Sequence, residues 1–436
     1  MLEHSSMGSV KDHRKVVVAA ILLVCWAASG IVAYSQRSQP AARIDLEQAI
    51  QLAIKHNHAL KAAQNTVDQS AADEITAAIR PNPVLTYDDL YIPIFSPAQL
   101  NTSTLDNVTE FDLGLSYTFE RGNKRKARIN AAKDATAVTR AQVQDNERSL
   151  TFNVAQQFVN VLQAKADIAL ANQDLAGFQQ TVDLSTNKFK AGAMSEGDLL
   201  KIKLQLLQFQ TDVSAAKLAL VQSLLNLRQL LGFESVPAHY DVIGELAYVP
   251  LRGNQEDMQA LALKQRPDLM AAQLGVNASE SQYQLAKANR ARSLTTTFTY
   301  SHVAAVNAAG FTMNIELPIF DRNQGEIART HTAMTQANEL QAAAAETVMT
   351  DVATAYQTVQ VNDQIVQLYT SGYLKQAQDS RDISEYAYKR GAASLLDYLD
   401  AERSYRAVQL TYRQSLAAYM LAVEQVKEAV GTRNLP

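Results

Sequence analysis

The pattern of apolar positions along the chain predicts a protein built mainly from long helices. No proline lies between Pro97 and Pro237 or between Pro318 and Pro436, and both stretches are rich in Ala, Leu, Gln, Lys and Glu, which favour helices. Apolar residues recur in these stretches in steps of three and four, as they do on the buried face of a helix. In the second stretch the series is Tyr405, Val408, Tyr412, Leu416, Tyr419, Val423 and Val426.

Each proline-free stretch is interrupted once by a turn signal. Gly192 and Gly391 follow basic residues, as at a helix end, and Ser195 and Ser394 come shortly after them. An Asp stands three residues beyond each serine, which is the pattern of a capping box that starts the next helix. We therefore expect two helices of about 100 Å and four helices of about half that length. Their ranges are 122–190 and 321–390 for the long ones, and 43–79, 195–231, 255–292 and 394–430 for the others.

Four short segments alternate between apolar and polar residues, at 84–92, 110–119, 294–303 and 311–317. Such alternation predicts strands with one apolar and one polar face. It is compatible with a small soluble sheet and also with membrane barrel strands, which need about 9–11 residues. Four strands cannot close a membrane barrel, for which about eight is the minimum, so closure would need several copies of the chain.

The two halves of the chain match each other in three ordered motifs. Around the turns, the motif Lys-x-Gly-Ala-x-Ser-x-x-Asp-x-Leu occurs at 190–200 and again at 389–399. The matches predict a duplicated chain, with a first structural repeat at 36–232 and a second at 254–431. Residues 233–253 would be a connector and 432–436 a C-terminal tail.

The N-terminus reads as an export signal covering residues 1–35. Lys11, Arg14 and Lys15 precede an apolar run at 16–28, and small residues follow, as in a secretory signal peptide. The alternative is an uncleaved anchor, although the run is short for a membrane span. Cys25 could be a lipidation site, but the residue before it is Val24 rather than a small one.

Composition narrows the functional classes. The 436 residues are 47% hydrophobic and 19% charged, which excludes disorder. The net charge of −4 gives no basic excess for nucleic acid, and a single Cys excludes disulfides and thiolate metal sites within the chain. His56 and His58 resemble a metal pair, but two imidazoles fall short of a three- or four-ligand site. We expect no cofactor, no metal site and, in the absence of a catalytic constellation, no enzyme.

The order helix, two strands, long helix, turn and helix, present twice, resembles the TolC family of outer-membrane efflux proteins. The turn motifs and the junction Phe119-Glu120-Arg121, repeated as Phe320-Asp321-Arg322, carry the resemblance. The segment 119–125 is most similar to the branch that serves heavy-metal or cation efflux pumps of the resistance-nodulation-division type. The resemblance implies a mainly helical fold with a small β part, in which duplicated coiled-coil hairpins and four membrane strands per chain form a trimeric α-barrel and 12-stranded β-barrel.

The resemblance also implies a function and its partners. A homotrimer in the outer membrane of a Gram-negative bacterium would extend into the periplasm. There it would meet a periplasmic adaptor protein and an inner-membrane pump. It would act as a passive exit duct for cations or small toxic compounds.

Three sets of residues take roles by this resemblance. Asp397 and Asp400 would line the pore aperture, whereas by their positions alone they could simply complement a helix N-terminus. Asp198 and Tyr388 would form a closed-state latch, although Ala393 stands where the family's latch has an Arg. The two turns would contact the adaptor, whereas by residue type alone they could simply be helix caps. The turn residues are Gly192, Ala193, Met194, Ser195, Gly391, Ala392, Ala393 and Ser394.

Two alternatives to the efflux duct stay open at this point. One is the outer-membrane component of type I protein secretion, which the same tunnel would serve. The other is a periplasmic coiled-coil adaptor or scaffold without a barrel, against which the alternation at 110–119 and 311–317 argues.

Overall fold

The computed structural model of the protein describes residues 42–435 except 93, 100 and 305. The predicted signal at 1–35, with Cys25, lies outside the described residues. The chain divides into two units, and the described residues of the smaller one are 42–43 and Pro237–Asp241. Strand β1 (Ala42–Ile44) pairs with β4 (Tyr240–Val242) in a two-stranded sheet. Everything that follows concerns the larger unit.

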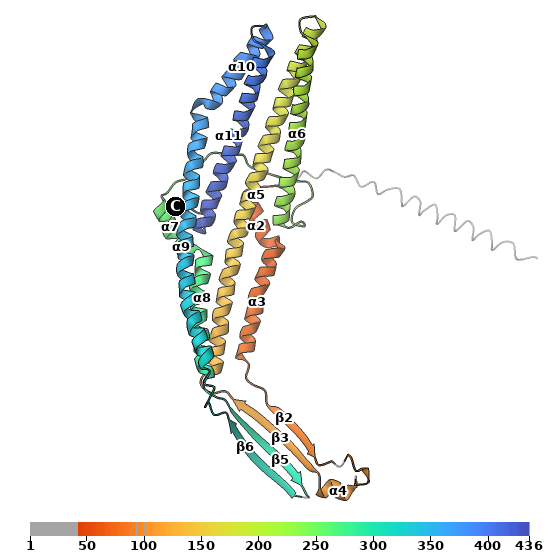
Figure 1. The fold of residues 1–436 in the computed structure, drawn as a ribbon, viewed down its shortest axis with the longest axis vertical. Helices are drawn as coiled ribbons and strands as arrows, with labels where there is room; N and C mark the ends of the chain where they lie inside the picture. Colours follow the sequence, from red (N-terminus) through yellow and green to blue (C-terminus); the bar gives the residue numbers. More distant parts are fainter. Residues whose placement is uncertain (1–41, 93, 100, 305, 436) are drawn as a thin grey trace, which may run out of the picture. The chain divides into compact units, whose positions relative to one another are not determined.

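The larger unit is mainly helical with a small sheet, which confirms the predicted fold class (Figure 1). The helices of the first half are α2 (Leu46–His56), α3 (His58–Ala78), α4 (Thr102–Asn107), α5 (Lys124–Lys190) and α6 (Glu196–Leu231). Those of the second half are α7 (Gln255–Gln265), α8 (Pro267–Asn289), α9 (Gln324–Leu368), α10 (Leu374–Arg390) and α11 (Leu395–Val430). A short 3₁₀ turn, Pro97–Gln99, precedes α4.

The prediction of one uninterrupted helix at 321–390 is wrong. A five-residue π-helical segment, Tyr369–Tyr373, separates α9 from α10, and within it Gly372 has φ 141° and ψ −17°. No L side chain adopts that conformation readily, so the interruption depends on the glycine. In Figure 1 the chain bends where α9 passes into α10.

The prediction of single helices at 43–79 and 255–292 is wrong in the same way, because each range contains two helices in the structure. Asn57 ends α2 and caps α3, because its backbone is extended and its side chain accepts a hydrogen bond from the Leu60 N–H at 3.0 Å. Arg266 takes the same place between α7 and α8, with Pro267 at the first helical position. A residue before proline is driven out of the helical region, which explains the second break.

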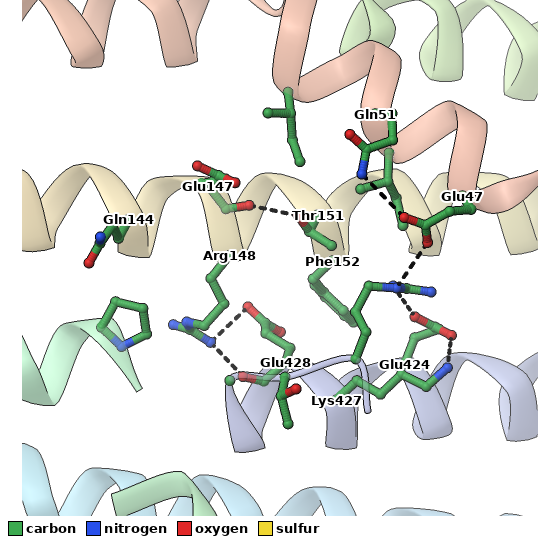
Figure 2. Close-up of a pocket in the computed structure, with 16 residues that line it drawn as sticks. Glu47, Gln51, Gln144, Glu147, Arg148, Thr151, Phe152, Glu424, Lys427 and Glu428 are labelled. Carbon is green, nitrogen blue, oxygen red and sulfur yellow. Dashed lines mark hydrogen bonds and ion pairs between the residues drawn. The ribbon is translucent and has the colours of Figure 1, made fainter. Parts of the chain in front are cut away.

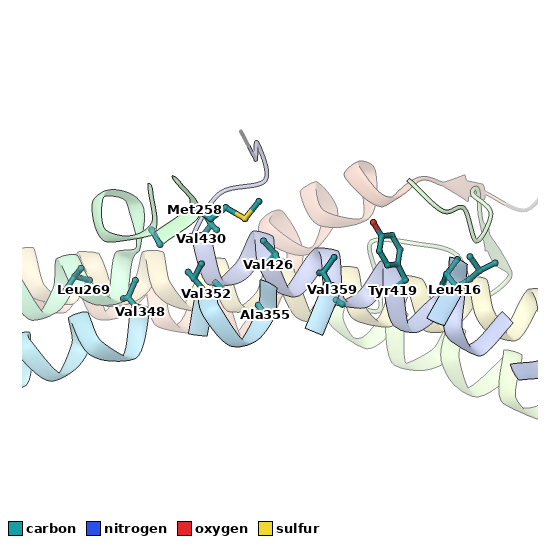
Figure 3. Close-up of a cluster of buried hydrophobic side chains, with 14 residues drawn as sticks. Met258, Leu269, Val348, Val352, Ala355, Val359, Leu416, Tyr419, Val426 and Val430 are labelled. Carbon is teal, nitrogen blue, oxygen red and sulfur yellow. The ribbon is translucent and has the colours of Figure 1, made fainter. Parts of the chain in front are cut away.

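Helix α5, with 67 residues, is the longest and the centre of the packing. It packs against α3 and α8 near the sheet and against α6 and α11 toward the turns. A core cluster of the second half lies between α7, α9 and α11 (Figure 3). Four valines of this cluster are fully or almost fully buried, namely Val348, Val352, Val359 and Val426. Tyr419 lies beside them, and its hydroxyl donates a hydrogen bond to the Val249 carbonyl at 2.8 Å.

The four predicted strands form one antiparallel sheet in the order β2-β3-β5-β6. Its strands are β2 (Val84–Leu90), β3 (Glu110–Phe119), β5 (Leu294–Val303) and β6 (Val306–Ile315). The last strand begins five residues earlier than the predicted 311, because Val306 pairs with Val303 across a tight hairpin. The hydrogen-bonded pair β3–β5 joins the two halves of the chain, and β2 and β6 are the sheet edges.

One arginine fixes the junction between sheet and helices in the first half. Arg128 binds both carboxylate oxygens of Glu120 at 2.7 and 3.2 Å and also donates to the carbonyls of Ala77 and Ile79. Arg128 thereby provides hydrogen-bond donors for the carbonyls at the end of α3, and it fixes the position of Glu120, the residue that follows β3. The matching residue of the second half, Arg329, is exposed, and among the described residues its ion pair is with Glu326, one turn earlier on its own helix.

Candidate functional site

The two turns are built alike, and their glycines are required by backbone conformation. Gly192 and Gly391 have φ of 73° and 77°, and a Cβ added at either one would point into open space within the described chain. Ser195 and Ser394 cap the following helices by accepting from the N–H of Asp198 and Asp397. Of the predicted turn residues, Met194 differs, because it packs against the core below the turns.

A buried cluster lies directly below the turns and joins the two hairpins. This tip cluster consists of Phe178, Val182, Ile202, Phe209, Tyr388, Tyr398 and Leu399. Its members come from α5, α6, α10 and α11, so the cluster ties the α5–α6 hairpin to the α10–α11 hairpin. Tyr388 is the one buried side chain along the described α10, and it is therefore the main apolar attachment of that helix.

The structure does not join the two predicted latch residues to each other. The Tyr388 hydroxyl lies 3.3 Å from the Ser185 hydroxyl on α5. Asp198 interacts with Ser195 and Lys201, and the Ser195 hydroxyl, followed by Lys201, lowers the pKa of the Asp198 carboxyl. Within one chain, Tyr388 is thus held by α5 and Asp198 by its own helix.

Several residues that hold the hairpins together were missed by sequence reasoning. Thr181 shares a hydrogen bond with the Tyr398 hydroxyl at 3.1 Å, and burial raises the pKa of Tyr398 to about 12. Lys188 donates to the carbonyl of Tyr388 at 3.3 Å and lies 4.8 Å from the centre of its ring. The signal that could have revealed them is a polar series at heptad spacing on α5, where core positions are usually apolar. This series is Asp167, Asp174, Thr181 and Lys188.

The predicted aperture residues lie at the start of α11, and both are exposed. Asp397 closes a capping box, accepting from the Ser394 hydroxyl at 2.7 Å and from the Ser394 N–H at 3.2 Å. Asp400 is one turn further on, so both carboxylates lie on one side of the helix. Asp397 thus has a structural role as a cap, whereas Asp400 is available to ions or solvent.

A charged hollow of about 420 Å³ lies between α2, α5, α11 and the C-terminal residues (Figure 2). Each basic side chain in it has a carboxylate partner. Arg148 approaches Glu428 at 3.5 Å, and Lys427 and Arg433 approach Glu424 at 2.6 and 3.0 Å. The hollow therefore joins the C-terminus to the first half of the chain rather than presenting free charge to a ligand.

The sheet has one apolar and one polar face, as its alternation predicted. The register places Leu115 beside Phe298 and Phe298 beside Phe311, and all three side chains are more than half exposed. On the opposite face the neighbouring row is Ser116, Thr297 and Thr312. Successive residues of a strand point to opposite faces, so the division extends from these rows toward the helices. At the hairpin end it breaks down, because His302 and Asn307 lie on the apolar face in the row of Phe111.

Aromatic residues gather at both ends of the apolar face. Phe111 contacts Tyr87 and Tyr300 near the hairpin end, with ring centres 5.2 and 6.2 Å apart, and Tyr117 contacts Phe119 near the helices. Phe111 and Phe119 are eight residues apart on β3, about 27 Å at the rise of a strand. Membrane barrels have an apolar band of about 25 Å flanked by aromatic girdles.

The part of the chain that the structure describes contains neither a membrane-crossing helix nor a metal-binding cluster. No helix among residues 42–435, apart from the gaps, is both long and apolar enough to cross a membrane. In the same residues, no three His, Cys, Asp or Glu side chains are arranged to hold a metal ion. His58 instead lies 3.0 Å from Glu234, and both side chains are exposed.

Each half of the chain supplies one long helical hairpin and two strands of a single amphipathic sheet. This architecture defines the class of outer-membrane efflux channels. The family described as outer membrane efflux protein matches residues 49–233 and 259–432, and the chain belongs to this family. The two matched segments fall on the two halves of the fold. The predicted resemblance and the predicted outer-membrane location are thereby confirmed.

Individual relatives agree with this assignment. The chain is 24% identical over 401 residues to the cobalt-zinc-cadmium resistance protein CzcC of Cupriavidus metallidurans, covering 90% of this chain and 91% of CzcC. It is 24% identical to the pyoverdine export outer membrane protein OpmQ of Pseudomonas putida, over 89% of this chain and 86% of OpmQ. A crystal structure of CusC has the same fold, with a TM-score of 0.72 and 21% identity over 91% of this chain and 96% of that one.

Proposed function

We propose that the protein is the passive exit duct of a tripartite efflux pump and catalyses no reaction. It would work as a homotrimer, with a periplasmic adaptor and an inner-membrane pump as partners. In this proposal residues 1–35 are removed on export, and the repeats 36–232 and 254–431, joined by 233–253 and followed by the tail 432–436, form the mature chain.

The observation that carries the trimer is the open, amphipathic sheet. Strands β2 and β6 leave their outer edges unpaired in the described chain, and an apolar face this exposed is unfavourable in water. Pairing β2 of one copy with β6 of the next covers both edges. Three copies supply 12 strands, which exceeds the minimum for a membrane barrel, with the apolar faces toward outer membrane lipid.

The helices support the same assembly. Helix α6 exposes an apolar series in steps of three and four that leaves one face unpartnered, including Leu200, Leu204, Leu207, Leu218, Val221 and Leu225. Near the π-helical segment, α9 and α10 expose Val361, Ile365, Leu368, Ile383 and Tyr386. Such series are typical of coiled-coil seams, so each face would meet the other on a neighbouring copy and close a helical tunnel.

The turn end supports an entrance. Three copies of Asp397 and Asp400 would give two stacked carboxylate rings, which favour cations. Latch contacts of Asp198 and Tyr388 would then be made between copies or in another state, since within one chain both have other partners. The small turn residues at 192–195 and 391–394 leave room for an approaching adaptor helix.

The cargo we propose is divalent transition-metal cations. CzcC is named for cobalt, zinc and cadmium resistance, and carboxylate rings suit cations. OpmQ is named for export of pyoverdine, an organic compound, so small organic molecules are the second candidate.

Metal tolerance tests the cargo. A Gram-negative host without its own outer-membrane efflux channel would receive a periplasmic adaptor and an inner-membrane pump of the metal-efflux type, with or without this chain. We expect the full set to raise tolerance to Co²⁺, Zn²⁺ or Cd²⁺ and to lower their cellular content, and omission of this chain to abolish both effects. Equal metal content with and without the chain would contradict the proposal.

A further inference from the structure

Buried and partly buried charged side chains lie between the two hairpins, and the proposed function does not explain them. They lie on the contact of α5 with α11, below the tip cluster. Asp167 and Asp174 come from α5, Glu402, Arg406 and Arg413 from α11, and Arg381 from α10. These six residues are called the polar seam below.

The contacts of the polar seam are unequal. Arg406 binds Asp174 at 3.2 Å and Asp212 of α6 at 2.5 Å, and its guanidinium also lies 4.1 Å from the centre of the Phe209 ring. One carboxylate oxygen of Asp167 is buried without a hydrogen-bond partner among the described residues. The Asp174 side chain and Glu402 are each only 8% exposed.

The arginines of the polar seam are shared with carboxylates outside it. Within the seam, three carboxylates face three guanidiniums. Arg406 also binds Asp212, and the Arg381 Nε lies 2.9 Å from Asp382. Glu385 of α10 faces Glu402 as well, but its own partner is Lys389 at 2.5 Å. Three guanidiniums therefore serve five carboxylates, and they cannot neutralise all of them when every one is ionised.

An uncompensated buried carboxylate favours proton uptake. Ionised groups lose their hydration on burial, so the packed state prefers the neutral acid. Burial accordingly raises the pKa of Asp167, Asp174 and Glu402 above the ordinary values, and the nearby arginines only reduce the shift. When the hairpins separate, water reaches these groups and their preference for the proton falls.

We propose that the polar seam is a proton-binding site, and that a proton bound there holds the α5–α6 and α10–α11 hairpins together. A carboxyl whose pKa is raised in the packed state stabilises the packing of the hairpins at low pH. This stabilisation is lost as the pH rises through that pKa. Acid therefore tightens the turn end, and neutral or alkaline conditions loosen it. That the tightened state is the closed channel rests on the proposed function.

Ser185 provides a reporter, because it is fully buried against Tyr388 where the hairpins meet. The purified mature protein, with any remaining Cys25 changed to Ser, would carry Ser185→Cys. Its rate of labelling by a maleimide would be divided by that of Gln180→Cys, an exposed position on α5 that is not on the α6 face proposed to meet another copy. The ratio cancels the ionisation of the thiol itself and measures how often the hairpins part.

We expect this ratio to rise severalfold between pH 5 and pH 8, because the proton that holds the hairpins together is lost as the pH rises. Glu402→Gln, which mimics the protonated acid, should label at pH 8 as slowly as the unsubstituted seam does at pH 5, with no pH dependence. Asp167→Asn should shift the ratio in the same direction and serves if Glu402→Gln does not fold. The control Asp183→Asn, on the exposed side of α5, should keep the full pH dependence.

A ratio that is constant with pH would overturn the proposal, and so would a Glu402→Gln protein that labels faster than its parent. Because the assay reports packing within one chain, its outcome does not depend on metal transport. A failed tolerance assay with a pH-dependent ratio would overturn only the proposed cargo or pump. The reverse pair of results would overturn only the proton-binding seam.

Discussion

The rings of Tyr388 and Tyr398 stack face to face, with centres 5.3 Å apart and planes inclined by 7°. Tyr388 lies in the last turn of α10 and Tyr398 in the first turn of α11. The stack therefore joins the two helices of the hairpin next to their turn. Each hydroxyl then reaches α5, one at Ser185 and the other at Thr181. The pair thus connects the two hairpins of one chain through four hydroxyl groups and two rings.

Removing these groups one at a time should separate their effects. Tyr398→Phe deletes one hydrogen bond and keeps the stack, which should cost about 1 kcal/mol of unfolding free energy. Tyr388→Ala removes a buried ring and should cost about 3–5 kcal/mol, with release of α10 from α5. Denaturant unfolding in detergent would measure both. Phe189→Ala, at a ring that is 38% exposed and outside the tip cluster, should change stability less, and an equal loss in this control would refute the assigned role.

Sequence periodicity predicted the long helices well where the backbone is regular. Helix α5 was predicted at 122–190 and found at Lys124–Lys190, because no proline interrupts its pattern and Gly177 within it keeps the helical conformation. The interruption at Gly372 was missed, since a lone glycine within a helical pattern is usually tolerated. Strands and turns were found from alternation and from glycine and serine signals.

The contacts between hairpins could not be predicted, because they depend on the register of α11 against α5. Nothing in the local pattern says that Arg406 would meet Asp174 or that Thr181 would meet Tyr398. Only the heptad-spaced polar residues of α5 hinted at a polar interface. The predicted roles of Asp397, Asp400, Asp198, Tyr388 and the turn residues stay predictions, because they involve other copies or other proteins.

Gly372 should be intolerant of any side chain. Gly372→Ala forces alanine to a φ of 141° and should cost on the order of 1–3 kcal/mol, or straighten the helix and displace α10. Gly177→Ala is the matched control, because Gly177 lies within regular α5 with open space around it. That change should be neutral or stabilise by up to about 1 kcal/mol. Similar melting temperatures for both variants would contradict the requirement for glycine at 372.

Arg128 and Arg329 match in sequence but not in contacts, so the same substitution should act differently at each. Arg128→Lys loses the forked interaction with Glu120 and the bonds to two carbonyls, which lysine cannot reproduce. We expect a loss of about 2–3 kcal/mol and a lower yield of assembled protein. Arg329→Lys alters an exposed pair and should stay within about 0.5 kcal/mol. Equal effects in urea unfolding would show that the end of α3 is not held by Arg128.

Asp400 and Asp397 should differ in a way that separates pore lining from helix capping. Asp400→Asn should lower the cation preference of single channels in a lipid bilayer and leave the melting temperature unchanged. Asp397→Ala should do the same and also lose the capping-box bonds, at about 1 kcal/mol. Ser394→Ala supplies the comparison, because it weakens the cap without removing a charge. Unchanged ion selectivity in Asp400→Asn would contradict its place at the aperture.

The mass of the protein extracted from the outer membrane tests the central claim most directly. The full-length chain would be expressed, inner and outer membranes separated, and the outer fraction solubilised in detergent. Light scattering corrected for bound detergent then gives the protein mass. The account predicts three copies of the chain, in which every open edge of β2 pairs with β6 of another copy. A monomer recovered from the soluble fraction would contradict it.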